Sequence, residues 1–235
     1  KGTKICFIIG YKKRQIKEYL NQKYSEYFEL EFIEQKPLGY TAEEPFFPGL
    51  GDAILYAQEF ALNEDIFIFL SDRVPLEDYS SILINFHQCD CDGVVNVKKV
   101  EEPQHYGVFK LDNDGFLTQI VEKPVIPESN IAVSGAYIIG KSIINRLFEL
   151  LEVQRKKTLK NGEVYQITPI IDKLIQEGAR IKSNEMIEEV LDFGRPESLL
   201  KGNRLLLSEI KNQDPIYEDL TKKGMIIDTK RIPPV

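Results

Sequence analysis

The feature that most constrains the fold is a series of short apolar runs that alternate with amphipathic segments. Residues 5–9, 30–35, 66–70 and 93–97 predict strands, and the runs at 5–9 and 66–70 are apolar without interruption. Such continuous runs are typical of strands that are covered on both faces. Apolar residues at helical spacing predict helices near 16–20, over 52–62 and over 79–86, with a loop at 36–51. This order predicts an α/β fold with a Rossmann-like, mixed but mainly parallel sheet covered by helices.

The second half of the sequence changes character. Residues 106–111 and 116–121 flank an Asp-Asn-Asp-Gly tetrapeptide that suits a hairpin turn, and residues 131–139 predict a further strand. Helices are expected over 142–151, over 169–176 with Thr168 as the N-cap, and over 196–210, with a short strand at 190–194. No change in composition marks a linker. We therefore expect a single domain over residues 1–215 with an inserted antiparallel layer.

Residues 216–235 are expected to form a C-terminal extension. Ile226 and Ile232 lie six residues apart in it, which is the coil repeat of a hexapeptide β-helix. The two interpretations are the start of a left-handed β-helix and a plain extension with a terminal strand.

Composition excludes several classes of protein. Thirty Lys and Arg stand against 37 Asp and Glu, a net charge of −7 that disfavours a non-specific nucleic-acid binder. No apolar run approaches the roughly 20 residues of a membrane-spanning helix. The cysteines, Cys6, Cys89 and Cys91, form no C-x-x-C pair, and no signal peptide opens the chain, so we expect free thiols and a cytoplasmic protein. The two histidines, His87 and His105, supply little for chemistry based on a Ser-His or Cys-His pair.

Two aspartates stand at the ends of predicted strands. Asp72 follows the run at 66–70, and Asp192 follows Val190 and Leu191. Ligands of open α/β sheets bind beyond the carboxyl ends of the strands, and two carboxylates at one rim suit a hard cation such as Mg²⁺. The alternative for each residue is a solvated strand-end aspartate that caps the next loop.

A charged pair, Glu122 and Lys123, ends another predicted strand and is followed by Pro124. A lysine there reaches a phosphate as a point charge, and a neighbouring acid binds sugar hydroxyls. The alternative is an ordinary charge pair on an edge strand. Gly107 and Gly135 would allow a ligand close to the backbone, although a bulge explains either glycine equally well.

Two further positions suit a nucleotide. Gln35 ends the second strand, and its amide offers both a donor and an acceptor to a base edge; the alternative is an exposed glutamine at a loop entry. Gly49 and Gly51 open a helix, which suits backbone contact with a nucleotide but equally makes a good loop-to-helix junction.

The joint order of these segments is more informative than any one of them. In order and rough spacing the chain closely resembles, over nearly its whole length, the sugar-1-phosphate nucleotidylyltransferases, the family that makes UDP- and dTDP-glucose. The segments that carry the resemblance are Gln35, Gly49-Leu50-Gly51-Asp52-Ala53, Leu70-Ser71-Asp72, Tyr106-Gly107-Val108, Val121-Glu122-Lys123-Pro124, residues 130–137, residues 162–168 and Leu191-Asp192-Phe193-Gly194.

The resemblance implies the nucleotide-diphospho-sugar transferase fold and a role for each matching residue. Asp72 and Asp192 match the aspartates that bind Mg²⁺, and Lys123 matches the lysine that holds the sugar phosphate. The positions that match the sugar site are Gly107, Glu122, Val133 and Tyr137, and those that match the base site are Gln35 and Gly49. The implied reaction joins a nucleoside monophosphate from UTP or dTTP to a hexose 1-phosphate, with glucose 1-phosphate expected, and releases pyrophosphate. We expect a homo-oligomer with no nucleic-acid or membrane partner.

The sequence departs from the family at its start. The family's first strand, its Gly-x-Gly-x-Arg loop and the following Lys-Pro segment have no match here, so we expect an N-terminally incomplete domain. This absence favours an alternative, a non-catalytic homologue that binds a sugar nucleotide or regulates a partner, whereas Asp72, Lys123 and Asp192 argue for the enzyme. A nucleotide-sugar glycosyltransferase is a weaker alternative because Asp72-Arg73-Val74 lacks the Asp-x-Asp pattern.

Overall fold

The computed structural model describes residues 3–41, 44–161, 164–188, 190–194 and 196–209. The chain divides into two compact units, the first made of Lys1–Ile68 and Ser80–Glu185 and the second of Phe69–Tyr79 and Met186–Val235. No helix within the described residues is long and apolar enough to cross a membrane. Residues 216–235, with Ile226 and Ile232, lie outside the described residues, so the β-helical extension stays a prediction.

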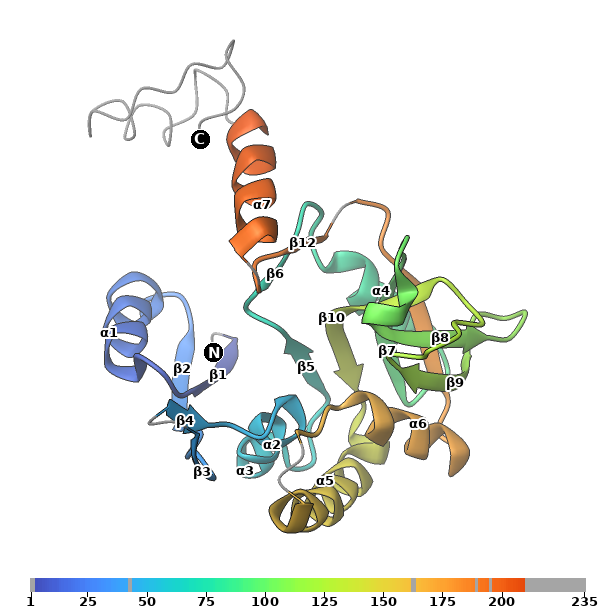
Figure 1. The fold of residues 1–235 in the computed structure, drawn as a ribbon, viewed down its shortest axis with the longest axis horizontal. Coiled ribbons are helices and arrows are strands. Elements are labelled where there is room, and N and C mark those ends of the chain that lie inside the picture. Colours follow the sequence, from blue (N-terminus) through green and yellow to red (C-terminus); the bar gives the residue numbers. More distant parts are fainter. Residues whose placement is uncertain (1–2, 42–43, 162–163, 189, 195, 210–235) are drawn as a thin grey trace. The chain divides into compact units, whose positions relative to one another are not determined.

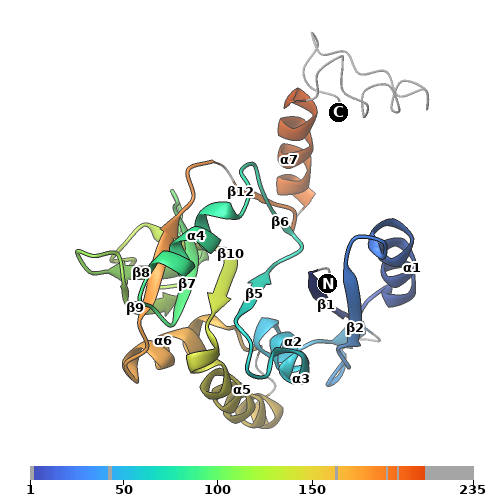
Figure 2. The same cartoon turned by 180° about the vertical axis from the view of Figure 1, so that it is seen from behind.

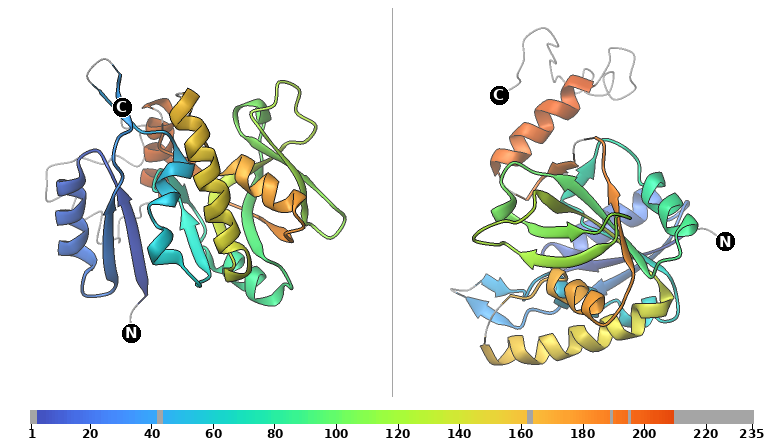
Figure 3. Two further views of the ribbon diagram at one scale, coloured as in Figure 1. Left: turned by 90° about the horizontal axis from the view of Figure 1, so that it is seen from below. Right: turned by 90° about the vertical axis from the view of Figure 1, so that its right-hand side faces the viewer.

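The first unit begins with a β-α-β segment, as predicted. Strands β1 (Lys4–Ile9) and β2 (Glu29–Glu34) pair in parallel and are joined by helix α1 (Lys13–Tyr24). Helix α1 lies along one face of this pair of strands (Figure 3, left). The rings of Phe7 and Phe32, which are partners in the register, stack with their centroids 5.5 Å apart. Cross-strand packing of this kind stabilises the register.

Residues 36–62 differ from the prediction in two ways. The predicted loop contains a hairpin of two short strands, β3 (Gly39–Thr41) and β4 (Glu44–Phe46). The predicted single helix is two helices, α2 (Leu50–Leu55) and α3 (Gln58–Ala61). The break arises because the amides of Tyr56 and Ala57 bond to carbonyls three residues back, those of Ala53 and Ile54, and so tighten the last turn of α2.

A six-stranded mixed sheet forms the centre of the first unit. Its strands are β5 (Ile66–Phe69), β7 (Gly93–Lys99), β8 (Gly107–Leu111), β9 (Leu117–Glu122), β10 (Ile131–Ile139) and β11 (Ile181–Glu185). The order is β11-β7-β10-β8-β9, and β5 also pairs with β10. The α/β fold is confirmed, but the sheet is more antiparallel than the sequence predicts: β11 runs parallel to β7, whereas the pairs β7–β10, β10–β8 and β8–β9 are antiparallel.

Helices cover both faces of this sheet (Figures 1 and 2). Helices α5 (Lys141–Asn161) and α6 (Thr168–Gln176) pack on one face, where Val95, Tyr137 and Ile139 join the main core. Helix α4 (Ser80–Gln88) contacts β7, β10 and β11 and buries Ile82 fully. Val94 and Ile138, which alternate with the core residues along their strands, are also buried. A single-turn 3₁₀ helix, Pro103–His105, precedes β8.

The second unit is a small ladder followed by a helix. Strand β6 (Arg73–Pro75) pairs antiparallel with β12 (Val190–Asp192), so that Arg73 lies opposite Asp192. Helix α7 (Pro196–Glu209) follows β12 (Figure 1). The helix packs closely on the loop before it, because a Cβ at Gly202 would lie 2.4 Å from the Phe193 ring.

Candidate active site

Two aspartates that are far apart in the sequence come together in the second unit. Asp72 directly precedes β6, and Asp192 is the last residue of β12. The Phe193 amide donates a hydrogen bond of 2.8 Å to the Asp72 backbone carbonyl, which fixes the two segments side by side. A Cβ placed on Gly194 would lie 3.1 Å from Asp192 Oδ1 and 3.1 Å from Asp72 Oδ2. The two carboxylate oxygens therefore flank one small space.

The partners of the two aspartates differ. The Gly194 amide donates to Asp192 Oδ1 at 2.8 Å, and the Arg73 guanidinium lies 3.0 Å from Asp192 Oδ2. Asp72 is exposed, and its carboxylate has no hydrogen bond or ion pair to any residue in the described ranges. Asp192 is thus held in place, whereas Asp72 keeps its full capacity to bind a ligand.

The chemistry of this pair suits a hard divalent cation. Carboxylate oxygens are the ligands that Mg²⁺ takes from proteins, usually one or two, with water and phosphate oxygens completing its shell. Within the described residues no group of three or more His, Cys, Asp or Glu side chains is arranged to hold a metal ion. Asp72 and Asp192 fit a cation that is shared with a phosphorylated substrate better than a closed structural metal site.

The β8–β9 hairpin of the first unit brings together two of the residues that were expected at a sugar. Gly107 lies opposite Glu122 in the register, and a Cβ on Gly107 would lie 3.1 Å from Glu122 Oε2. The same Cβ would lie 2.9 Å from Thr168 Cγ2, so Gly107 is a point of close approach between the hairpin and the start of α6. Thr168 was expected as the N-cap of α6, which is wrong: the N-cap is Ile167, and Thr168 is buried against Gly107.

Lys123 leaves the end of β9 in an unusual backbone conformation. Its φ is +45°, in the left-handed region that residues other than glycine rarely adopt. A hydrogen bond of 2.9 Å from its amide to the Tyr106 carbonyl holds it there. The side chain is exposed and forms no ion pair with any residue that the structure describes. Strained residues of this kind cluster at ligand sites, and the unpaired ammonium group is available to an anion.

Strand β10, which pairs with β8 of this hairpin at one position, carries the remaining two expected sugar-site residues, Val133 and Tyr137. Ala132 pairs with Val108, which follows Gly107. The register then shifts between Val133 and Tyr137, where Gly135 has a φ of +87°. Val133 is half-buried, and Tyr137 is 3% exposed and belongs to the main core.

Gln35, one of the two residues expected at the base, contacts a buried aspartate. Gln35 Nε2 donates to Asp52 Oδ2 at 2.9 Å. Asp52 is 0% exposed, and its other oxygen, Oδ1, accepts from the Tyr165 hydroxyl at 3.3 Å and lies 3.2 Å from Arg155 Nε. Burial, and next the charge of Asp52, raise the pKa of Tyr165 above its ordinary value, so the hydroxyl stays a donor. These contacts form a polar cluster within the first unit, in which the buried Arg155 Nε lies near Asp52 without a hydrogen bond to any described residue.

Gly49 is fixed in this cluster by its backbone. Its φ is +104°, and a Cβ on it would lie 2.6 Å from the Tyr165 carbonyl oxygen and 2.6 Å from Val164 Cγ1. The Tyr165 backbone is in turn bonded on both sides, from its amide to the Pro48 carbonyl at 2.8 Å and from the Gly51 amide to its carbonyl at 3.2 Å. Only glycine fits at position 49.

Sequence reasoning missed three residues of this cluster. Asp52 and Tyr165 stand inside segments that the sequence singles out, but nothing in the sequence pairs them, and Arg155 lies in a helix that the sequence predicts to end at residue 151. The one available signal was Asp52 itself, an acid in the first turn of a helix and surrounded by glycine and apolar residues.

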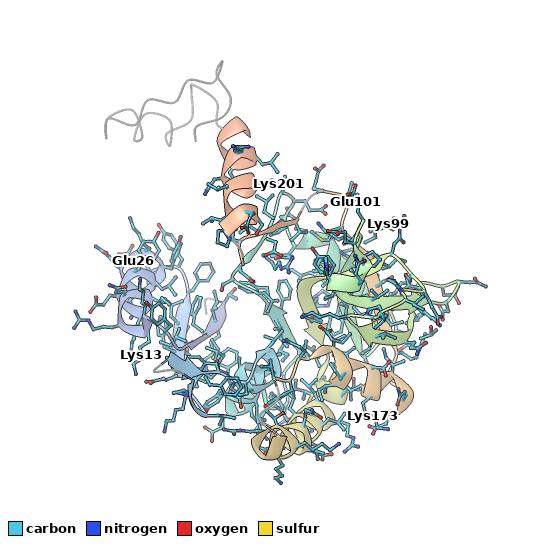
Figure 4. The ribbon with its side chains drawn as sticks, in the orientation of Figure 1. Lys13, Glu26, Lys99, Glu101, Lys173 and Lys201 are labelled. Carbon is cyan, nitrogen blue, oxygen red and sulfur yellow. The ribbon has the colours of Figure 1, made fainter. Side chains whose placement is uncertain are left out.

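Two exposed lysines of the first unit, Lys99 and Lys173, lie close to glutamates. Lys99 on β7 and Lys173 on α6 point outward (Figure 4), and they lie 3.1 Å from Glu185 and 4.0 Å from Glu177, respectively. In a chain with a net charge of −7, attraction of a phosphorylated ligand depends on local cations rather than on the field of the whole molecule.

Comparisons with known proteins show the family of this chain. The family model described as nucleotidyl transferase matches residues 2–209. The low-salt glycan biosynthesis nucleotidyltransferase Agl11 of Haloferax volcanii is 29% identical over 95% of this chain and 59% of its own length. The bifunctional protein GlmU of Methanocaldococcus jannaschii is 29% identical over 95% of this chain and 48% of its own. The chain therefore spans about half to three-fifths of the length of these relatives.

Solved structures show the same fold. A glucose-1-phosphate thymidylyltransferase structure from Bacillus anthracis covers 88% of this chain and 77% of its own, with a TM-score of 0.72 and 22% identity. A UDP-glucose pyrophosphorylase solved with UDP-glucose covers 88% of this chain and 82% of its own, with a TM-score of 0.70 and 24% identity.

A further relative, the UTP–glucose-1-phosphate uridylyltransferase AglF of Haloferax volcanii, is 26% identical over 88% of this chain and 79% of its own. The family match over most of the sequence shows that this chain belongs to the nucleotidyl transferase family.

Proposed function

We propose that the protein transfers a nucleoside monophosphate from UTP or dTTP to a hexose 1-phosphate and releases pyrophosphate, with glucose 1-phosphate as the acceptor. The observation that carries the proposal is the meeting of Asp72 Oδ2 and Asp192 Oδ1 around Gly194. Similarity to AglF, which is named a UTP–glucose-1-phosphate uridylyltransferase, supports the choice of substrates.

The first unit supplies the groups that would bind the sugar phosphate. The exposed ammonium of Lys123 would neutralise the phosphate as a point charge. Glu122, whose Oε2 lies beside Gly107, would accept hydrogen bonds from sugar hydroxyls. The absence of a side chain at Gly107 leaves the backbone open to close approach by the sugar.

The reaction needs no covalent intermediate and no general base. An oxygen of the sugar phosphate, which is already anionic, attacks the α-phosphorus of the triphosphate. The new phosphorus–oxygen bond forms as the bond between the α-phosphorus and the bridging oxygen breaks, and pyrophosphate leaves with the electron pair. Catalysis then depends on alignment of the two substrates and on neutralisation of their charge.

Asp72 and Asp192 would hold Mg²⁺, and the bound ion would supply positive charge to phosphate oxygens. The Arg73 guanidinium, 3.0 Å from Asp192 Oδ2, keeps that carboxylate oriented. The Gly194 amide, which donates to Oδ1 of the same residue, adds a second restraint. These two contacts preorganise one ligand before any cation arrives.

Pyrophosphate release by the intact protein tests the proposal. With UTP, glucose 1-phosphate and Mg²⁺ we expect turnover, and Lys123→Ala should raise the KM for the sugar phosphate at least about tenfold, the loss of one charge-assisted contact. Lys99→Ala is the matched control, since Lys99 is an exposed lysine paired with Glu185. Binding of both substrates without release of pyrophosphate would overturn the proposal in favour of a non-catalytic homologue.

A further inference from the structure

The first unit contains a carboxylate that the proposed reaction does not use. Asp52 is fully buried in the first turn of α2 and contacts Gln35, Tyr165 and Arg155. A buried carboxylate is costly unless every lone pair finds a partner. The cost indicates that Asp52 has a task that an apolar residue could not perform.

The contact between Asp52 and Gln35 determines how the glutamine amide is turned. A carboxylate paired with an arginine is an acceptor only, so the group of Gln35 that faces it has to be the Nε2 donor. The amide is planar, and its carbonyl oxygen, Oε1, therefore points away from Asp52 Oδ2. Within the described residues Oε1 accepts no hydrogen bond, and Gln35 is half-buried at the end of β2. An acceptor of fixed orientation is thus available to a ligand.

The surrounding cluster makes this orientation rigid. The Arg155 guanidinium lies over the Tyr56 ring, 5.5 Å from its centroid, while its Nε contacts Asp52 Oδ1. The Tyr165 hydroxyl bonds to the same oxygen, and the Tyr165 backbone is held by Pro48 and Gly51. Asp52 Oδ1 is thereby occupied, which leaves Oδ2 for Gln35 alone.

We propose that Asp52 is a positioning residue that sets the specificity for the base of the nucleotide. It fixes the Gln35 amide so that Oε1 accepts a hydrogen bond from a ring N–H. Uracil and thymine offer such a donor at N3, whereas N3 of cytosine is an acceptor and would face Oε1 unpaired. This inference rests on the proposed function, a transfer from UTP or dTTP, and on the position of Gln35 at the base, which the resemblance to the family implies.

The first test replaces the carboxylate by an amide of the same shape. In Asp52→Asn, the group that faces Gln35 is either a donor or an acceptor, so the glutamine amide is free to turn over. We expect the ratio of kcat/KM for UTP to that for CTP to fall at least about tenfold, the effect of one hydrogen bond in a buried site. A ratio equal to that of the unmodified protein would overturn the proposal.

Asp172→Asn is the matched control. Asp172 Oδ2 also accepts from a glutamine amide, that of Gln176 at 2.5 Å, and its Oδ1 accepts from the Ile120 amide. The same chemical change is therefore made at another Asp–Gln contact of the first unit. We expect the UTP-to-CTP ratio to stay unchanged in this variant.

The second test uses the unmodified protein and does not depend on the folding of a variant. UTP methylated at N3 lacks the proton that Oε1 would accept, and we expect it to bind at least about tenfold more weakly than UTP. Equal binding of the two nucleotides would overturn the inference. Selective binding without pyrophosphate release would overturn the proposed function alone, whereas pyrophosphate release with CTP as efficient as with UTP would overturn the inference alone.

Discussion

The two units present aspartates in opposite settings. In the first, Asp52 is completely buried, and both of its oxygens are occupied by Gln35, Tyr165 and Arg155. In the second, Asp192 is 29% exposed beside Arg73, and Asp72 is exposed with no partner among the described residues. An arginine stands beside a carboxylate in both places. What differs is the number of protein partners: Asp52 contacts three side chains, whereas the Asp72 carboxylate has none among the described residues and is available to a ligand.

The largest expected effect is on the rate of pyrophosphate release when one of the two aspartates, Asp72 and Asp192, is removed. Asp192→Ala should lower kcat/KM for pyrophosphate release by about 10³-fold, because charge stabilisation of the phosphates is lost. Asp114→Ala, a change at an exposed turn residue, is the control and should leave the rate unchanged. A rate for Asp192→Ala equal to that of the control would show that this pair is not part of the site.

The next largest effect is on stability, when Asp52 is removed from its contacts with Gln35, Tyr165 and Arg155. Asp52→Ala should lower the free energy of unfolding by about 3 kcal/mol, because it leaves the mostly buried Arg155 charge without its partner. Asp72→Ala should change it by less than about 0.5 kcal/mol, as is usual for an exposed residue. Urea unfolding of both variants measures the difference, and equal values would contradict the contrast between the units.

Two glycines of the first unit with nearly the same φ separate the effect of close packing from that of backbone strain. Gly49→Ala places a Cβ 2.6 Å from backbone oxygen at a φ of +104°, and should cost about 2 kcal/mol of stability or more. Gly178 has nearly the same φ, +102°, but nothing within 4 Å of its Cβ position. Gly178→Ala should therefore cost only about 1 kcal/mol, from the backbone alone. Thermal unfolding at equal concentrations compares the two.

Beside Asp72 and Asp192 in the second unit, a change of glycine to alanine should affect ion binding more than stability. A Cβ at Gly194 lies 3.1 Å from the two carboxylate oxygens and would push the ends of the Asp72 and Asp192 side chains aside. Gly194→Ala should raise the Mg²⁺ concentration for half-maximal rate about tenfold. Its free energy of unfolding should change by less than about 0.5 kcal/mol. An unaltered Mg²⁺ requirement would argue against this position of the ion.

The smallest effect concerns pH. Burial raises the pKa of Tyr165 in the folded state above the value of 10.0 that it has when unfolded. The folded state therefore retains a proton that the unfolded state loses, so this contribution is full below about pH 10 and is lost as the pH rises beyond it. Between about pH 9 and about pH 11 the unmodified protein should lose about 1 kcal/mol more stability than Tyr165→Phe. Parallel curves for the two proteins would contradict this.

The long apolar elements were predictable and the short polar ones were not. The strand expected at 131–139 matches β10, because apolar residues mark its whole length. Strand β11 was missed because its sequence, Ile-Lys-Ser-Asn-Glu, is mostly polar and depends on pairing with β7. Strand β6 was missed because only three residues form it, opposite β12. Local pattern predicts elements with their own apolar face, and tertiary pairing creates the others.

In the candidate site too, some residues were predictable from the local sequence, whereas others are brought together only by the folded chain. The strand-end positions of Asp72 and Asp192 and the resemblance to a family both indicated these residues, and the structure brings the two together. The hydrogen bond between Tyr165 and Asp52 joins residues 113 positions apart in the sequence. The ion pair between Asp52 and Arg155 likewise forms only in the folded chain. No local pattern indicates such pairs, since each partner taken alone is an ordinary helix or loop residue.

Phosphorus NMR of the intact protein with UTP, glucose 1-phosphate and Mg²⁺ tests nucleotidyl transfer most directly. The account predicts that a sugar nucleotide and pyrophosphate appear in equal amounts and only when both substrates are present. Unchanged UTP, or its hydrolysis without a sugar nucleotide, would contradict it.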